Sequence, residues 1–254
     1  MLRPEPLDVK MIEDVLERIR KELSGRFKNN FKSLILYGSW AKRTPRTDSD
    51  IDLVALFARA TKEARKSMYD IGRSVDTDRC ITIIPASVED FQKEKLPVYT
   101  AAKKEGKILY GDADLSINPE PERTKYADFF KNSHRFESQK VTIAEQLLGE
   151  NLTSGIAELC FVASKHAIQA ALAMEGEGYS SKICVLLPLA EKYLGREIAS
   201  RFSRLFRLYI KSEYEMEPLT DEEAELAIKY AKMVMGVYQL DIKKATSNTN
   251  SNTS

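Results

Sequence analysis

The chain has 254 residues, enough for two domains that each bury a core. Lys and Arg number 39 and Asp and Glu number 38, so no overall field favours nucleic acid or a membrane surface as a partner. No apolar run approaches the ~18 residues that span a bilayer, and the N-terminus lacks the apolar segment of a signal peptide. We therefore expect a cytoplasmic protein, with neither a membrane nor nucleic acid among its partners.

Cysteine and histidine are scarce. Cys80, Cys160 and Cys184 are widely spaced and form no CxxC pair, so neither a disulfide framework nor a zinc site is predicted. We expect three buried, reduced thiols. With only His134 and His166 in the chain, chemistry that needs a histidine cluster is excluded.

Strand and helix patterns alternate in the first half of the chain. The expected elements are a helix over 8–23, strands over 33–37 and 51–57, a helix over 61–74, a strand over 80–84 stopped by Pro85, a helix from a Ser87 capping box through Phe91, a helix over 98–104 and a strand over 108–110. Interleaved strands and helices predict an α/β or α+β domain over residues 1–112.

Composition changes after residue 112. A polar stretch with prolines, 113–124, predicts a linker. Helical periodicity then dominates, with breaks at glycines and at Pro218; the expected helices cover 125–149, 152–175, 181–194, 197–214 and 220–240. The pattern predicts an all-α bundle over 125–242, followed by a disordered tail without apolar residues over 243–254.

One stretch carries recognisable chemistry: a short strand ending in Gly38-Ser39, ten residues, and then Asp50-Ile51-Asp52. A Gly-Ser turn at a helix start offers backbone N–H groups and a hydroxyl to phosphate oxygens. Alternation along a strand places Asp50 and Asp52 on one face. Two adjacent carboxylates repel each other unless a cation lies between them, and hard oxygen ligands that share a metal with a triphosphate suit Mg²⁺.

This spacing resembles the GS-x10-DxD signature of the polymerase-beta-like nucleotidyltransferases. The resemblance covers residues 30–110 and includes the ending Glu105-Gly106-Lys107-Ile108-Leu109-Tyr110-Gly111. It implies a small mixed sheet with helices. The helical half resembles the HEPN domain that often accompanies minimal nucleotidyltransferase domains, and the two-part layout is similar to that of kanamycin-type nucleotidyltransferases. The HEPN likeness also implies a homodimer through the helical domain.

The sequence departs from this family at the third carboxylate, which members place on the strand after the intervening helix. That strand, 79–85, contains no acid, and the family position falls near Cys80 or Thr82. Asp78, at the strand entrance, is the nearest candidate for the third catalytic acid, and Asp76 is the second. Acids of the helical domain, such as Glu145 and Glu158, are a further alternative.

Other residues of the turn have two interpretations each. Lys42, Arg43 and Arg46 either bind triphosphate oxygens or belong to a solvated loop. Trp40 either stacks on a nucleotide base or packs at the helix start. In the helical half, neither histidine follows an arginine at the spacing of the HEPN ribonuclease motif, and His166 is expected at the edge of the core.

The resemblance predicts a Mg²⁺-dependent enzyme that moves a nucleoside monophosphate, AMP if ATP is the donor, from an NTP to a hydroxyl and releases pyrophosphate. Asp50 and Asp52 would bind the metal, while Gly38, Ser39, Lys42 and Arg43 would hold the triphosphate. The sequence does not distinguish between a small molecule and a protein as the acceptor of the nucleoside monophosphate. The alternative is a nucleotide- or partner-binding module of antitoxin type with weak or no catalysis, which the missing third carboxylate motivates.

Overall fold

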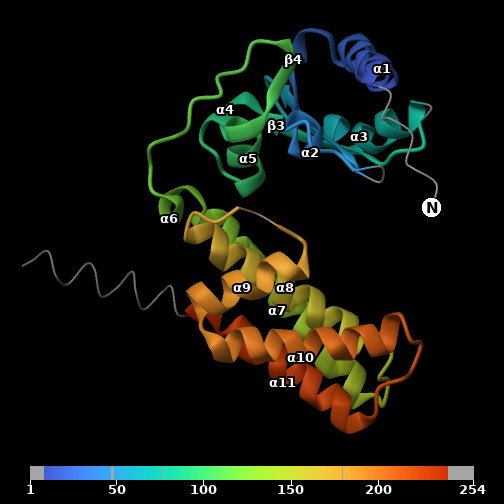
Figure 1. The fold of residues 1–254 in the computed structure, drawn as a ribbon, viewed down its shortest axis with the longest axis vertical. Coiled ribbons are helices and arrows are strands. Elements are labelled where there is room, and N and C mark those ends of the chain that lie inside the picture. Colours follow the sequence, from blue (N-terminus) through green and yellow to red (C-terminus); the bar gives the residue numbers. More distant parts are fainter. Residues whose placement is uncertain (1–8, 47–48, 76, 179, 240–254) are drawn as a thin grey trace, which may run out of the picture. The chain divides into compact units, whose positions relative to one another are not determined.

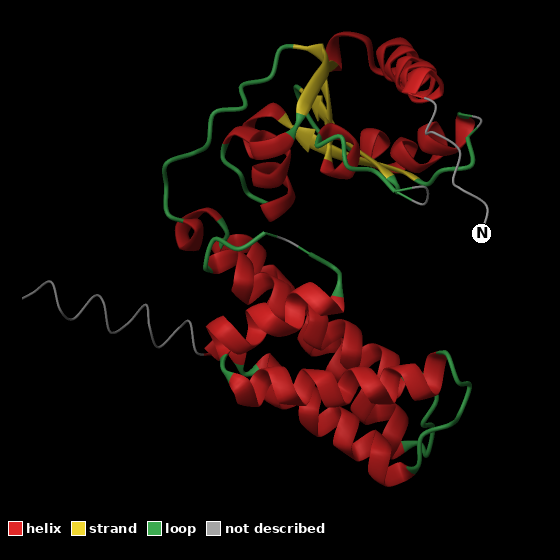
Figure 2. Ribbon diagram, viewed as in Figure 1, coloured by secondary structure: helices red, strands yellow, loops and turns green. Residues whose placement is uncertain are grey.

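The computed structural model describes residues 9–46, 49–75, 77–178 and 180–239. It divides into two compact units, Met1–Glu120 and Pro121–Ser254 (Figure 1). All four strands belong to the first unit, and the described part of the second unit is helical (Figure 2). The predicted tail over 243–254 and Asp76 lie outside the described residues.

The first unit is built on a four-stranded sheet with the order β3-β2-β1-β4. Its strands are β1 (Phe31–Tyr37), β2 (Ile51–Phe57), β3 (Ile81–Ser87) and β4 (Lys107–Gly111). Its helices are α1 (Val9–Phe27), α2 (Gly38–Ala41), α3 (Lys62–Ser74), α4 (Val88–Gln92) and α5 (Pro97–Glu105), with a 3-10 turn at Lys28–Asn30. β1 pairs antiparallel with β2 and β4, whereas β2 and β3 are parallel. The sheet is therefore mixed, which confirms the predicted α+β class.

Each face of the sheet packs on its own hydrophobic cluster. Ile51, Leu53 and Phe57 of β2 are fully buried in a cluster with residues of α1 and α3. The alternate residues Val54 and Leu56 point the other way, into a cluster with residues of α4 and α5. A strand buried on both faces reads as a continuous apolar run, which explains why the sequence pattern located β2 so well.

Two sequence predictions are wrong, one about β3 and one about the cysteines of both units. β3 is not stopped by Pro85: the strand continues to Ser87, and Pro85 pairs with Ala55 of β2. β3 forms an edge of the sheet, where a residue without an N–H group is tolerated. The expectation of three buried thiols also fails, because Cys80 and Cys184 are exposed and only Cys160 is buried.

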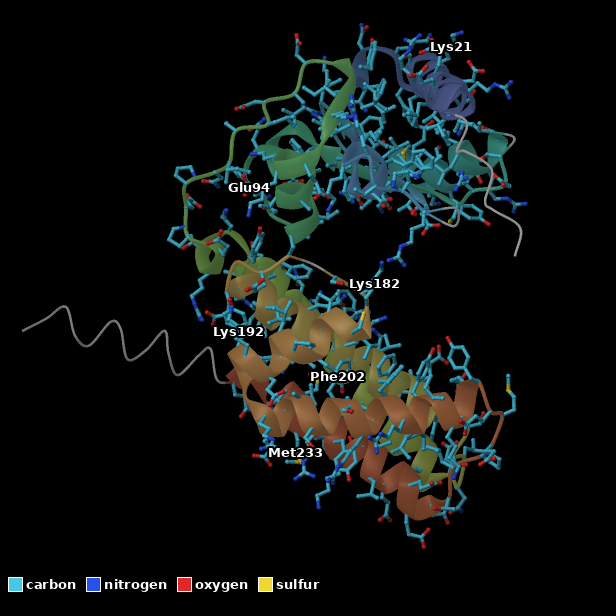
Figure 3. All side chains as sticks on the ribbon, viewed as in Figure 1. Lys21, Glu94, Lys182, Lys192, Phe202 and Met233 are labelled. Atoms are coloured by element: carbon cyan, nitrogen blue, oxygen red, sulfur yellow. The ribbon has the colours of Figure 1, made fainter. Side chains whose placement is uncertain are left out.

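The segment after β4, expected to be a linker, is held against the first unit by a buried ion pair. Lys103 Nζ lies 3.1 Å from Glu94 Oε1, and both side chains are almost fully excluded from solvent. Lys103 also donates to the carbonyl oxygen of Ser116 at 2.8 Å, and Glu94 accepts hydrogen bonds from Thr100 Oγ1 and from the Asn118 N–H (Figure 3 labels Glu94). Residues 116–118 are thus part of the first unit.

The second unit is an all-α bundle. Its helices are α6 (Glu122–Lys125), α7 (Ala127–Gly149), α8 (Ile156–Met174), α9 (Ile183–Leu194), α10 (Arg196–Glu213) and α11 (Asp221–Met235). The Thr220 capping box predicted for the last helix is present, with the Thr220 and Glu223 side chains each bonding the other's backbone N–H. α8 is long and apolar enough to cross a membrane, but 72% of it is buried, because it is the central helix of the bundle. Phe202, labelled in Figure 3, is fully buried in the same core.

Candidate active site

The sharp turn between β1 and α2 centres on Gly38. Its φ angle is +74°, a left-handed conformation that glycine adopts without steric cost. A Cβ atom added to Gly38 would lie 2.8 Å from Oδ2 of Asp52. The absence of a side chain at Gly38 therefore lets the Asp52 carboxylate lie directly against the turn.

The two predicted metal-binding acids lie at the start of β2. Asp50 is exposed just before the strand, and Asp52 is half-buried within it, opposite Tyr37 in the antiparallel ladder. Burial, the charge of Asp50 and the charge of Glu105 together raise the pKa of Asp52 to about 6. Mutual repulsion of this kind is what a bound cation relieves, so the pair fits a divalent metal.

Glu105, the last residue of α5, is a third acid at this turn that the sequence analysis did not assign. Its Oε1 accepts a hydrogen bond from the Gly38 N–H at 3.1 Å, and its Oε2 lies 2.7 Å from Lys42 Nζ. Among the described residues, no group of three or more His, Cys, Asp or Glu side chains is arranged to hold a metal. Through these two contacts Glu105 is bound to the Gly38 turn.

A signal for Glu105 was available in the sequence. The residue belongs to the Glu-Gly-Lys-Ile-Leu-Tyr-Gly ending, and β4 begins two residues after it. Because β4 pairs with β1, with Lys107 opposite Leu36, the residues just before β4 must lie near the end of β1. Recognising that pairing in advance would have placed Glu105 beside Gly38.

The basic residues of the turn differ in their surroundings. Lys42 follows α2 directly and forms an ion pair with Glu105. Arg43 is exposed and has a positive φ of 59°. Arg46 is exposed, and its backbone N–H donates to Ser49 Oγ at 2.7 Å. Ser39 is half-buried in α2, and its carbonyl oxygen accepts from the Thr44 N–H at 2.9 Å.

Trp40 holds the loop between α2 and β2 in place through two contacts. Its indole N–H donates to the Ser49 carbonyl oxygen at 3.3 Å, and the Arg79 guanidinium lies 5.2 Å from the centre of its ring. These contacts tie α2 to the residue before Asp50 and to the segment before β3. They favour the packing interpretation of Trp40 over stacking on a nucleotide base.

The pairing of β2 with β3 shows which residues of β3 lie beside the predicted metal-binding acids. Asp52 pairs with Thr82, and the Ile51 N–H donates to the Cys80 carbonyl oxygen at 2.9 Å. Directly opposite residues in a sheet share a face, so Thr82 is the neighbour of Asp52 on β3. Thr82 and Cys80 are the two positions near which the resemblance predicts the third acid. Asp78 is exposed on the bend that leads into β3, two residues before Cys80.

The second unit contains two further candidate acids, Glu145 and Glu158, and both histidines. Glu145 of α7 forms an ion pair with Lys232, whereas Glu158 of α8 is exposed. His166 is half-buried, and its Nδ1 lies 2.9 Å from Oε1 of the buried Glu137. The exposed His134 stacks on Tyr238. His166 thus lies at the edge of the core, paired with a buried carboxylate.

Comparison with known families agrees with this geometry. Residues 17–115 match the family described as "Polymerase beta, Nucleotidyltransferase", and residues 138–241 match the HEPN domain. The chain therefore joins a domain of the polymerase-beta nucleotidyltransferase family to a HEPN domain.

Among solved structures, the spectinomycin adenyltransferase AAD(9) from Enterococcus faecialis is similar, with 15% identity, a TM-score of 0.47 and coverage of 87% of this chain and 98% of that one. A nucleotidyltransferase-like protein from Exiguobacterium sibiricum 255-15 has 12% identity and a TM-score of 0.43, over 92% of this chain and 80% of that one. A toxin-antitoxin structure with AMP-PNP has 15% identity and a TM-score of 0.28, over 53% and 97%. No curated protein matches the chain.

Proposed function

We propose that the first unit binds an NTP, with ATP as the expected donor, and transfers its nucleoside monophosphate to a hydroxyl of a small molecule or a protein. The observation that supports this most is the contact between Asp52 and the Gly38 turn. It places the Asp52 carboxylate against the glycine turn, and the basic residue Lys42 follows the short helix that begins at this turn. A metal–triphosphate complex needs carboxylates for the cation and positive charge near the phosphates.

Each residue of the site then has a distinct task. Asp50 and Asp52 would hold Mg²⁺, which when bound neutralises charge on the triphosphate and on the departing pyrophosphate. The Gly38 and Ser39 backbone and the Ser39 hydroxyl would hold phosphate oxygens. Lys42 and Arg43 would add positive charge near the phosphates.

The reaction forms one bond and breaks one. The acceptor oxygen bonds to the α-phosphorus, the bond from that phosphorus to the oxygen bridging to the β-phosphate breaks, and pyrophosphate leaves. The hydroxyl proton needs an acceptor. We assign this role to Asp78, because its segment runs beside the start of β2: Cys80 already bonds Ile51, the residue after Asp50.

A second candidate is a module of antitoxin type that binds nucleotide or a partner protein without turnover. The specific observation in its favour is that Thr82, which has no carboxylate, lies beside Asp52, and Thr82 is one of the two positions near which the third acid is expected. The two candidates differ in pyrophosphate release in the presence of ATP, Mg²⁺ and an acceptor. Turnover requires it, and a binding module does not produce it.

The test of the proposed function is ATP binding by calorimetry, with and without Mg²⁺, for the wild type, for Asp50→Asn and for a control. Asp70→Asn is a suitable control, because Asp70 is an exposed acid on α3 of the same unit. We expect Mg²⁺ to strengthen ATP binding in the wild type and in the control, and not in Asp50→Asn. Equal Mg²⁺ dependence in all three proteins would contradict the assignment. The mass of the protein in solution tests the implied homodimer.

A further inference from the structure

The carboxylate of Glu105 binds two groups that, under the proposed function, would bind the triphosphate: the Gly38 N–H and the Lys42 ammonium group. Oε1 accepts from the Gly38 N–H at 3.1 Å and Oε2 lies 2.7 Å from Lys42 Nζ. The link is long-range, because Glu105 belongs to α5 and the turn follows β1, 67 residues earlier. Glu105 is half-buried, so this is a defined contact rather than a fully solvated pair.

Carboxylate and phosphate oxygens compete for such donors. Both are anionic acceptors of charge-assisted hydrogen bonds, and one ammonium group cannot be neutralised fully by both at once. Glu105 also lies near Asp52, since its charge acts on that carboxyl group. A triphosphate entering the turn would therefore add negative charge beside two acids that are already close.

We propose that Glu105 is a positioning residue that holds the Gly38 turn and Lys42 as an internal anion in the nucleotide-free protein, and that the triphosphate takes Lys42 from it on binding. This inference rests on the proposed function. Glu105 keeps the turn ordered before nucleotide arrives, and it weakens nucleotide binding by the free energy of its pair with Lys42. When pyrophosphate leaves, the Glu105 carboxylate recovers its ion pair with Lys42.

The test is a double-mutant cycle on ATP affinity in the full-length protein. Glu105→Gln keeps an oxygen that can accept from the Gly38 N–H but removes the charge that holds Lys42. Ion pairs of this exposure are worth ~0.2–1 kcal/mol, which corresponds to an affinity change of up to about fivefold. We therefore expect Glu105→Gln to bind ATP about 1.4- to fivefold more tightly than the wild type. In a Lys42→Met background the same change should have a clearly smaller effect, because only the repulsion between Glu105 and the triphosphate is then relieved.

The matched control is Glu89→Gln, because Glu89 pairs with Lys93 at the same distance of 2.7 Å on α4. Its ATP affinity should equal that of the wild type. A gain in affinity cannot come from damage to the fold, so the expected result separates competition from a purely structural role. Should wild type bind ATP while Glu105→Gln binds equally or more weakly, the inference is wrong and the proposed function stands. A wild type that binds no ATP would refute both.

A structure with an ATP analogue bound gives an independent measurement that needs no variant. We expect Lys42 Nζ to contact phosphate oxygens and to lie more than ~4 Å, the usual ion-pair limit, from Glu105. A pair that remains at 2.7 Å in the nucleotide complex would overturn the inference.

Discussion

The carboxylate of Asp52 lies against the backbone of Gly38, so close that a single added carbon would be 2.8 Å from Oδ2. One packing contact thus joins the acid expected to bind metal to the turn expected to bind phosphates. The two parts of the motif are twelve residues apart between Gly38 and Asp50, and the antiparallel pairing of β1 with β2 brings them together.

Gly38→Ala should impair both stability and nucleotide binding. A left-handed conformation costs a residue with a Cβ roughly 1–2 kcal/mol, and the new methyl group would displace Asp52. Denaturant unfolding can be followed through Trp40, the only tryptophan, which lies in the same unit. Gly25→Ala in α1 is the control, because its added Cβ has no neighbour within 4 Å and helix propensity favours alanine. Unchanged ATP affinity in Gly38→Ala would contradict the claim that the contact between Gly38 and Asp52 joins the metal-binding and phosphate-binding parts of the site.

Asp52 should make the stability of the metal-free protein depend on pH. Its pKa rises from 3.8 to about 6 on folding, so the ionised carboxylate costs stability, beginning near pH 4 and reaching the full cost above pH 6. Asp52→Asn should therefore raise the melting temperature at pH 7 and change it little at pH 4. Mg²⁺ should reduce this difference by stabilising the ionised wild type. Asp70→Asn should show no such pH dependence, and a gain for Asp52→Asn that is equal at both pH values would refute the prediction.

Lys103→Met should strongly destabilise the first unit. It leaves the Glu94 carboxylate buried without its cation, a change that typically costs ~3–5 kcal/mol. Glu94→Gln in the same chain should recover part of the loss, because it removes the uncompensated charge. Lys93→Met breaks an exposed pair of similar length and should cost about 0–1 kcal/mol. Unfolding monitored by Trp40 fluorescence measures all three variants, and equal effects of the two lysine substitutions would show that burial does not matter here.

Asp78→Asn tests the assignment of the proton acceptor. General-base assistance is typically worth ~10²–10⁴ in rate, so transfer should slow by that factor while ATP affinity stays nearly the same. Single-turnover kinetics with labelled ATP separate the two quantities. A variant that transfers at the wild-type rate would remove Asp78 from the mechanism and direct attention to acids such as Glu158 of the helical domain.

Local patterns in the sequence were sufficient for much of the fold and for locating the turn and the strand that carry the candidate site residues. These features depend on residues close together in the chain: the turn at Gly38, Asp52 on β2 with Asp50 directly before the strand, and the Ser87 and Thr220 caps. Their geometry follows from backbone preferences and side-chain alternation over a few residues. Such features can be located without knowing how the chain packs.

The features that were missed depend on contacts between distant residues. Glu105 acquires its role because β4 pairs with β1, and Pro85 is tolerated because β3 is an edge strand; neither fact is visible in the local sequence. The segment expected to be a linker is partly fixed by Lys103, whose burial only the packed α4 and α5 reveal. The pairing of strands that are distant in the sequence therefore determines which acids lie beside the Gly38 turn.

The central claim, nucleotidyl transfer that depends on Asp50 and Asp52, is tested most directly by pyrophosphate release. The full-length protein would be incubated with α-labelled ATP, Mg²⁺ and a panel of hydroxyl acceptors, small molecules and proteins, including the protein itself. We predict stoichiometric pyrophosphate and label on one acceptor for the wild type and for Asp70→Asn, and neither product for Asp50→Asn or Asp52→Asn. Label transfer by the two motif variants at the wild-type rate would contradict the account.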